Sequence, residues 1–75
     1  MPIEFVKVTF PTDRFVYVDD EKNGRTNDVI RVDTGTHIFD LGNLPNYRPA
    51  QRKVVVQDTT VLDPMVIAFF RKDDD

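Results

Sequence analysis

The sequence contains no cysteine and no serine, and its single histidine is His37. Without cysteine, the chain has no disulfide, no thiolate metal site and no cysteine nucleophile. Without serine, it also lacks the Ser-His-Asp arrangement of hydrolases. A histidine that acts as a base or a metal ligand needs partners, and only carboxylates are available here. We therefore expect no enzyme and no cofactor, and a structural role for His37.

Long hydrophobic runs and an excess of basic residues are also missing. The longest apolar stretches, 54–56 and 65–70, fall far short of the ~20 residues that cross a bilayer. The net charge of −3, from ten basic and thirteen acidic residues, argues against nucleic-acid binding and against an anionic membrane surface. The N-terminal residues lack the basic and apolar segments of a signal peptide. We expect a cytoplasmic protein as the chain stands, or an extracytoplasmic one if it is an excised module.

Short stretches rich in valine, isoleucine, phenylalanine, tyrosine and threonine recur between turn signals. Such stretches predict β-strands, and no window shows the apolar spacing of a helix. The predicted strands cover residues 3–10, 14–19, 28–33, 36–41, 52–57 and 65–70, with a short strand at Val61 and Leu62. The pattern predicts one domain over residues 1–75, in which 71–75 form a frayed tail.

The connections contain the residues that favour turns. Pro11 ends the first strand, because proline cannot donate to a ladder. The polar stretch Asp-Asp-Glu-Lys-Asn-Gly is predicted to be a connection with a tight turn at Asn23-Gly24, and Thr34-Gly35 is predicted to form the next turn. Residues 42–50 are predicted to form an irregular loop in which Tyr47 is the one large apolar anchor.

These elements predict an all-β fold, a small antiparallel β-sandwich of about six or seven short strands, similar to immunoglobulin domains and without substantial helix. Alternation along each strand predicts which side chains face the core. The predicted core consists of Val6, Val8, Val16, Val18, Ile30, Val32, Phe39, Leu41, Val54, Val56, Ile67 and Phe69.

The order of these signals resembles the PEGA domain, a small bacterial and archaeal β-sandwich module. The resemblance covers about residues 8–70, and its namesake Pro-Glu-Gly-Ala is replaced here by Pro-Thr-Asp-Arg. The residues that carry it are Pro11, Val16-Tyr17-Val18-Asp19, Gly24-Arg25-Thr26, Gly35-Thr36-His37 and Asn46-Tyr47. The resemblance implies a non-catalytic module of extracytoplasmic, surface or signalling proteins, without catalytic residues of its own.

Two short patterns could mark binding sites. Asp19, Glu21, Asn23 and Gly24 stand at the offsets of a calcium loop, but Ile30 occupies the position of its bidentate glutamate. We therefore expect a solvated turn and no metal site.

The second pattern is a basic cluster, Arg48, Arg52 and Lys53, beside Tyr47. It either contacts a partner or forms a charged strand edge that discourages aggregation. We expect a non-catalytic interaction module that contacts a protein or a cell-envelope component through a sheet edge or loop face, with these four residues as candidate contacts. The alternative is a carbohydrate-binding module that uses Tyr47 or Tyr17 as an exposed platform.

Overall fold

A computed structural model describes residues 2–42 and 46–72, and this part of the chain contains nine strands and no helix. The strands are β1 (Ile3–Thr9), β2 (Phe15–Val18), β3 (Glu21–Arg25), β4 (Val29–Asp33), β5 (Gly35–Asp40), β6 (Tyr47–Arg48), β7 (Arg52–Val56), β8 (Met65–Ala68) and β9 (Phe70–Arg71). The seven strands of four or more residues correspond to the strand number that the sequence predicts.

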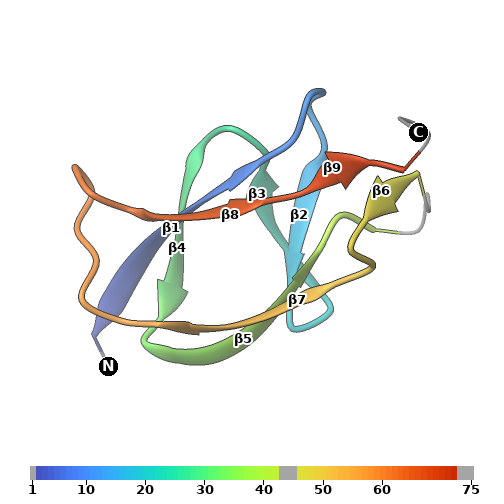
Figure 1. The fold of residues 1–75 in the computed structure, drawn as a ribbon. Helices are drawn as coiled ribbons and strands as arrows, with labels where there is room; N and C mark the ends of the chain where they lie inside the picture. The colour runs from blue at the N-terminus through green and yellow to red at the C-terminus, as the bar shows by residue number, and fades with distance from the viewer. Residues whose placement is uncertain (1, 43–45, 73–75) are drawn as a thin grey trace.

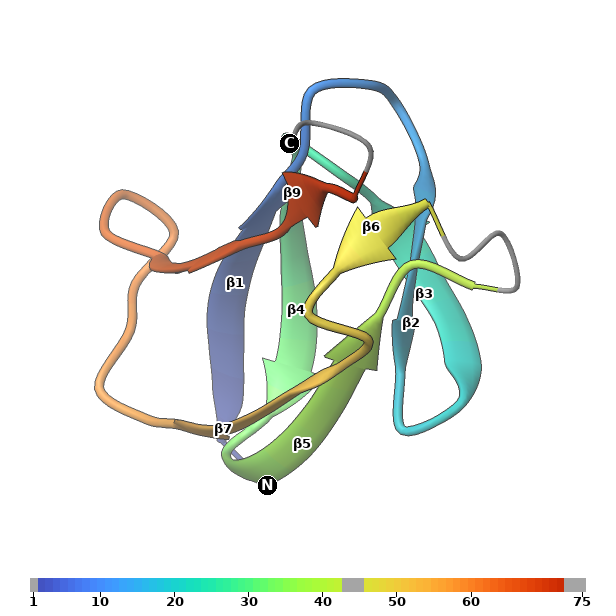
Figure 2. The same ribbon diagram turned by 45° about the vertical axis from the view of Figure 1, so that its right-hand side comes forward.

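The strands form two sheets that pack face to face, with a small ribbon at one end (Figures 1 and 2). One sheet has the order β4-β1-β8, the other the order β3-β2-β5-β7, and β6 pairs with β9. The predicted all-β sandwich is therefore confirmed.

One strand pair departs from the predicted antiparallel arrangement. β1 and β8 run parallel, from Val6 beside Met65 to Thr9 beside Ala68. Two strands joined by a tight hairpin must run antiparallel. β1 and β8 are far apart in the chain, so no hairpin imposes that direction on them. The direction of β8 is set by the connection 57–64, which crosses from β7 in one sheet to β8 in the other (Figure 1).

The core confirms the alternation of apolar side chains. All the predicted core residues are buried except Val54, which is half-buried and packs against the cluster. Two aromatic side chains, Phe10 and Tyr47, complete the core although the predicted core omits them. Phe10 continues the buried face of β1 one residue beyond the strand, so the alternation extends past the last ladder pair.

The polar stretch after β2 is a strand, and not the connection that the sequence predicts. The chain reverses at Asp19 and Asp20, whose φ values are 52° and 68°, and Val18 pairs directly with Glu21. A two-residue hairpin turn of this kind needs positive φ at both positions, which aspartate tolerates better than most residues. Asp19 also accepts a hydrogen bond from the Ile38 backbone N–H at 2.9 Å. This bond fixes the turn against β5.

Gly24 therefore lies in a bulge of β3 rather than in a tight turn. The register with β2 shifts between Val16 and Tyr17, and the φ of Gly24 is 149°. A Cβ at Gly24 would lie 2.4 Å from Cγ2 of Ile30 in β4. The absent side chain lets β3 approach β4, and this contact closes one side of the sandwich.

The segments near the C-terminus differ from the prediction in three places. Val61 and Leu62 form a turn between Thr60 and Asp63, which bridge each other, instead of a short strand. The predicted last strand is divided into β8 and β9. β6 forms within the predicted loop, because the backbone of Tyr47 pairs with that of Arg71. Residues 43–45 of the predicted loop and 73–75 of the predicted tail lie outside the described residues.

Thr59 pairs with the part of β1 that β8 does not reach. Its hydroxyl accepts the Phe5 N–H at 2.7 Å and donates to Oε1 of Glu4 at 2.6 Å, while its own N–H donates to the same oxygen at 2.9 Å. These bonds hold the pKa of the buried Glu4 carboxyl below its ordinary value. One polar side chain thus takes the place of a strand partner.

Replacement of Gly24 by alanine tests the closed side of the sandwich. We expect Gly24→Ala to cost more stability than Gly35→Ala, since both positions have positive φ but only Gly24 meets a neighbour. Backbone strain alone costs roughly 1–3 kcal/mol, and overpacking adds about 1–3 kcal/mol. Urea denaturation measures both losses, and equal losses would contradict the close approach of β3 and β4.

Candidate functional site

His37 joins the β2–β3 turn to the end of β4. Its Nδ1 lies 2.6 Å from a carboxylate oxygen of Asp19, and its Nε2 lies 2.6 Å from the backbone oxygen of Asp33. Both partners are hydrogen-bond acceptors, so both ring nitrogens donate when the ring is doubly protonated. The geometry therefore favours the charged imidazolium form.

The electrostatics of this contact agree with its geometry. Burial of the His37 ring lowers its pKa, but hydrogen bonds to Asp19 and to the Asp33 backbone together raise the pKa above the ordinary 6.5. The pKa of the Asp19 carboxyl is lowered by the hydrogen bond from His37 and by that from the Ile38 N–H. Only 14% of the His37 side chain is exposed. The pair is thus an ion pair that holds the turn on β5.

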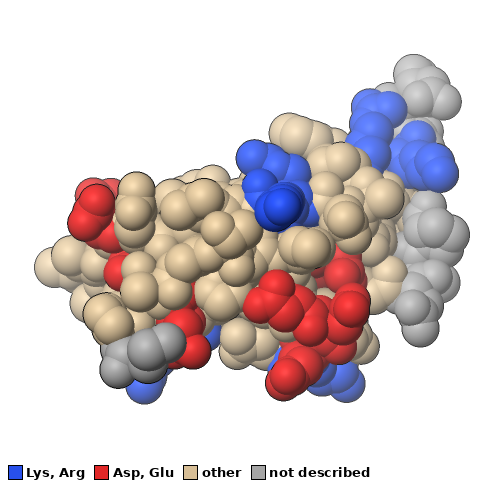
Figure 3. All heavy atoms as spheres, turned by 90° about the horizontal axis from the view of Figure 1, so that it is seen from below, with Lys and Arg blue, Asp and Glu red and all other residues tan. Residues whose placement is uncertain are grey.

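The surface beside His37 forms a depression of about 410 Å³. Its lining includes the acids Asp19, Glu21 and Asp33 together with the bases Lys22 and Arg31. Figure 3 shows acidic side chains gathered around the β2–β3 hairpin on the face seen from below. In the described part of the chain, every buried side-chain nitrogen and oxygen already has a hydrogen-bond partner. An imidazolium that donates from both nitrogens has no lone pair for proton abstraction, so we infer a structural role for His37.

The positions of the calcium-like pattern do not converge. Asp19 binds His37 and the Ile38 N–H, and the Asn23 amide donates to the backbone oxygen of Arg31 at 3.2 Å. Within residues 2–42 and 46–72, no three carboxylate or imidazole side chains come together as metal ligands would. The polar residues of the hairpin instead attach β3 to β5 and to β4.

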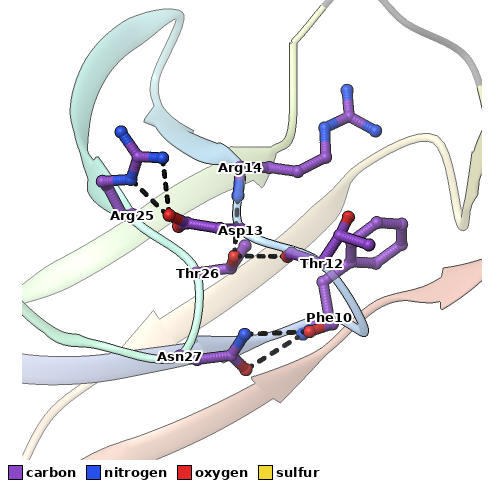
Figure 4. A network of polar contacts seen from close by, with 7 residues as sticks. All are labelled: Phe10, Thr12, Asp13, Arg14, Arg25, Thr26 and Asn27. Atoms are coloured by element: carbon purple, nitrogen blue, oxygen red, sulfur yellow. Dashed lines mark hydrogen bonds and ion pairs between the residues drawn. The ribbon is translucent and has the colours of Figure 1, made fainter.

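Figure 4 shows a second polar network, which fixes the connection between β1 and β2. The Thr26 hydroxyl accepts the Arg14 N–H and donates to the Thr12 backbone oxygen, both at 2.9 Å. The Asn27 amide donates to the Phe10 backbone oxygen at 2.9 Å and accepts the Phe10 N–H at 3.4 Å. These side chains bind backbone groups, so they position the turn.

An aromatic surface lies beside this network. Asp13 accepts two hydrogen bonds from Arg25, at 2.9 and 2.6 Å, and the Arg25 guanidinium lies 4.6 Å from the ring centre of Phe15. The Lys22 ammonium lies 4.1 Å from the same ring centre. A depression of about 470 Å³ on this surface also contains Tyr17, which is half-buried. The Phe15 ring already stacks with two cations, which leaves it a poor platform for a sugar.

The four predicted contact residues do not form one site. Tyr47 belongs to the core: it is 7% exposed, its hydroxyl donates to the Gly42 backbone oxygen at 2.9 Å, and its ring meets Phe10 and Phe69 edge-on. Its ring is therefore not an exposed platform. Arg48 is exposed on β6.

Arg52 and Lys53 lie next to each other on β7 and point to opposite faces of the sheet. The Arg52 guanidinium donates to the backbone oxygen of Ala68 in β8 at 3.3 Å. Lys53 is exposed on the outer face.

The outer side of β7 carries backbone groups without a partner. Ile38 of β5 exchanges backbone hydrogen bonds with the β2–β3 turn, because its oxygen accepts the Asp19 N–H at 2.8 Å and its N–H binds the Asp19 carboxylate. Since a strand residue directs its N–H and C=O to the same side, Ile38 and its neighbour Lys53 are not bonded to each other. Alternation then directs the N–H and C=O groups of Lys53 and Val55 away from β5, where no described residue binds them.

The other strand edges are covered only in part. β3 and β4 are held together by the Gly24 contact and by the amide of Asn23. The Phe69 N–H binds the Thr9 oxygen, so Phe69 directs its backbone groups toward β1. By alternation along β8, the backbone groups of Val66 and Ala68 point outward. The Ala68 oxygen is bound by Arg52. β7 is therefore an edge whose outward backbone groups have no partner in the described part of the fold. No single sequence signal identifies it, because an edge is a property of the sheet order.

Comparison of the chain with protein family models, with curated proteins and with solved structures finds no match. The resemblance to the PEGA domain therefore stays a prediction. The described residues include no helix long and apolar enough to span a membrane.

The ion pair of His37 predicts the pH dependence of stability. Because folding raises the His37 pKa, its contribution is complete below the unfolded value of about 6.5 and is lost as the pH rises through the folded pKa. The contribution of Asp19, whose pKa falls on folding, is present above its unfolded pKa of about 3.9 and is lost as the pH falls through the folded pKa. The pair therefore stabilises the fold between the two folded pKa values.

The single histidine permits a direct measurement by NMR titration of its ring protons. We expect a His37 pKa above 6.5 that falls in the Asp19→Asn variant. The matched control is Asp20→Asn, which removes the same charge from the neighbouring turn residue. A wild-type pKa at or below 6.5, or an equal change in both variants, would contradict the ion pair.

Proposed function

We propose that this chain is a non-catalytic interaction module that binds a polypeptide partner by adding one of its strands to β7. The observation that carries the proposal is the open edge, where the backbone groups of Lys53 and Val55 have no described partner. An extended segment that pairs there satisfies these groups with main-chain hydrogen bonds, as in other cases of strand addition.

The side chains near this edge support the same function. Val55 is 54% exposed on the outer face of β7, and Val54 and Met65 are half-buried toward the core. A strand beside β7 would remove part of this apolar surface from water, which adds to the main-chain bonds. Arg52 donates to the Ala68 oxygen of β8, and Lys53 borders the open edge of β7.

A non-catalytic role is supported by the composition and by the state of His37. Serine and cysteine are absent, and both ring nitrogens of the only histidine are hydrogen-bonded. The carbohydrate-binding alternative has less support. It requires an open tyrosine ring, but Tyr47 is in the core and Tyr17 is half-buried, with its ring against the backbone of Gly42.

A proline at Val55 tests the proposal. The Val55 N–H points away from β5, so Val55→Pro should leave the β5–β7 ladder in place and remove a donor from the open edge. We expect partner binding to fall by about tenfold or more, because the loss of one hydrogen bond and the steric block together exceed about 1.4 kcal/mol. Immobilised wild-type and variant proteins would be compared in pull-downs from cytosolic and envelope fractions.

The control is Val66→Pro, which places the same residue at a similarly exposed valine on the edge of β8. A partner that binds the wild type and Val66→Pro but not Val55→Pro supports strand addition at β7. Equal capture by both variants, with unchanged circular dichroism, would rule out β7 as the binding edge. The fraction that supplies the partner also identifies the compartment.

A further inference from the structure

We propose that the strand added to β7 comes from a second copy of this chain, which pairs antiparallel about a twofold axis through Val55. This inference rests on the proposed function, since it names the partner of the same edge. It follows from the backbone directions of β7 and from the order of side chains along it.

The backbone groups of β7 match themselves. Lys53 and Val55 direct their N–H and C=O groups outward, and Gln57, the next position of this alternation, lies directly after the end of β7 at Val56. A twofold axis at Val55 places Val55 opposite Val55 of the other copy, and Lys53 opposite Gln57. Each of these opposed positions offers one donor and one acceptor on either side, so both strands satisfy their outward groups in a single register.

The side chains favour this register over its neighbours. It places Lys53 opposite the neutral Gln57, which directly follows β7. An axis through Lys53 would instead place two lysines directly opposite each other, which destabilises a strand pair. Valine faces valine at the centre, and branched pairs of this kind pack well between antiparallel strands.

The pairing also covers the open side of the sandwich. It joins the two β3-β2-β5-β7 sheets into one continuous sheet and leaves the contact of Gly24 with β4 and the bond from Arg52 to β8 unchanged. A single short strand pair buries less surface than the ~1,200–2,000 Å² of stable interfaces, so we expect weak, concentration-dependent association. Each copy has a net charge of −3, and salt near 0.15 M screens their mutual repulsion.

Charge substitutions at Val55 provide the test, because a twofold axis makes this residue its own neighbour. Val55 is 54% exposed, so lysine or glutamate is compatible with the monomer. We expect the wild type to dimerise in sedimentation velocity over about 10 μM to 1 mM, a range that covers weak dissociation constants. Val55→Lys alone and Val55→Glu alone should each lose at least about tenfold in dimer affinity, and an equal mixture of the two should regain it as a heterodimer.

The matched controls are Val66→Lys and Val66→Glu, which place the same charges on a valine that is 61% exposed on β8. These variants should dimerise like the wild type. A wild type that stays monomeric at all concentrations overturns the inference, and so does a mixture that does not recover. If the wild type is monomeric but binds another partner, and Val55→Pro abolishes that binding, the proposed function stands. Only a second copy of this chain is then excluded as the partner.

Discussion

Each strand of a sheet has two sides, and the backbone groups on both sides need hydrogen-bond partners. This constraint governs the structure more than any single side-chain contact. The described residues form seven strands of four or more residues, which build two facing sheets but do not close both sides of the sandwich. One side closes where β3 approaches β4, and the other stays open along β7.

Several polar residues serve this backbone requirement. Asn23 binds a carbonyl of β4, Thr59 binds the part of β1 beyond the reach of β8, and Arg52 binds a carbonyl of β8. Thr26 and Asn27 bind the backbone of the first connection in the same manner. Polar side chains at the rim of a small sandwich therefore resemble a binding site in sequence, while in three dimensions they replace missing strand partners.

His37 combines a structural and an electrostatic role. Its ring is enclosed between a turn and a strand end, and its two nitrogens bind one charged and one neutral acceptor. The same contact that raises its pKa fixes Asp19, and Asp19 in turn fixes the backbone of Ile38. Because the backbone groups of Ile38 are bound on the side of Asp19, they are not available to β7. By alternation along β7, the backbone groups of Lys53 and Val55 then face outward.

The sequence by itself determined the all-β fold and nearly all of the core, because burial on one face of a strand imposes alternation on neighbouring residues such as Val6 and Val8. It also determined that chemistry based on serine or cysteine is excluded. Only the tertiary structure decided that β8 runs parallel to β1, that Asp19 and Asp20 form the turn in place of Asn23 and Gly24, and that β7 has an open edge. These features depend on contacts between residues far apart in the chain. Local sequence patterns do not determine which strand lies beside which.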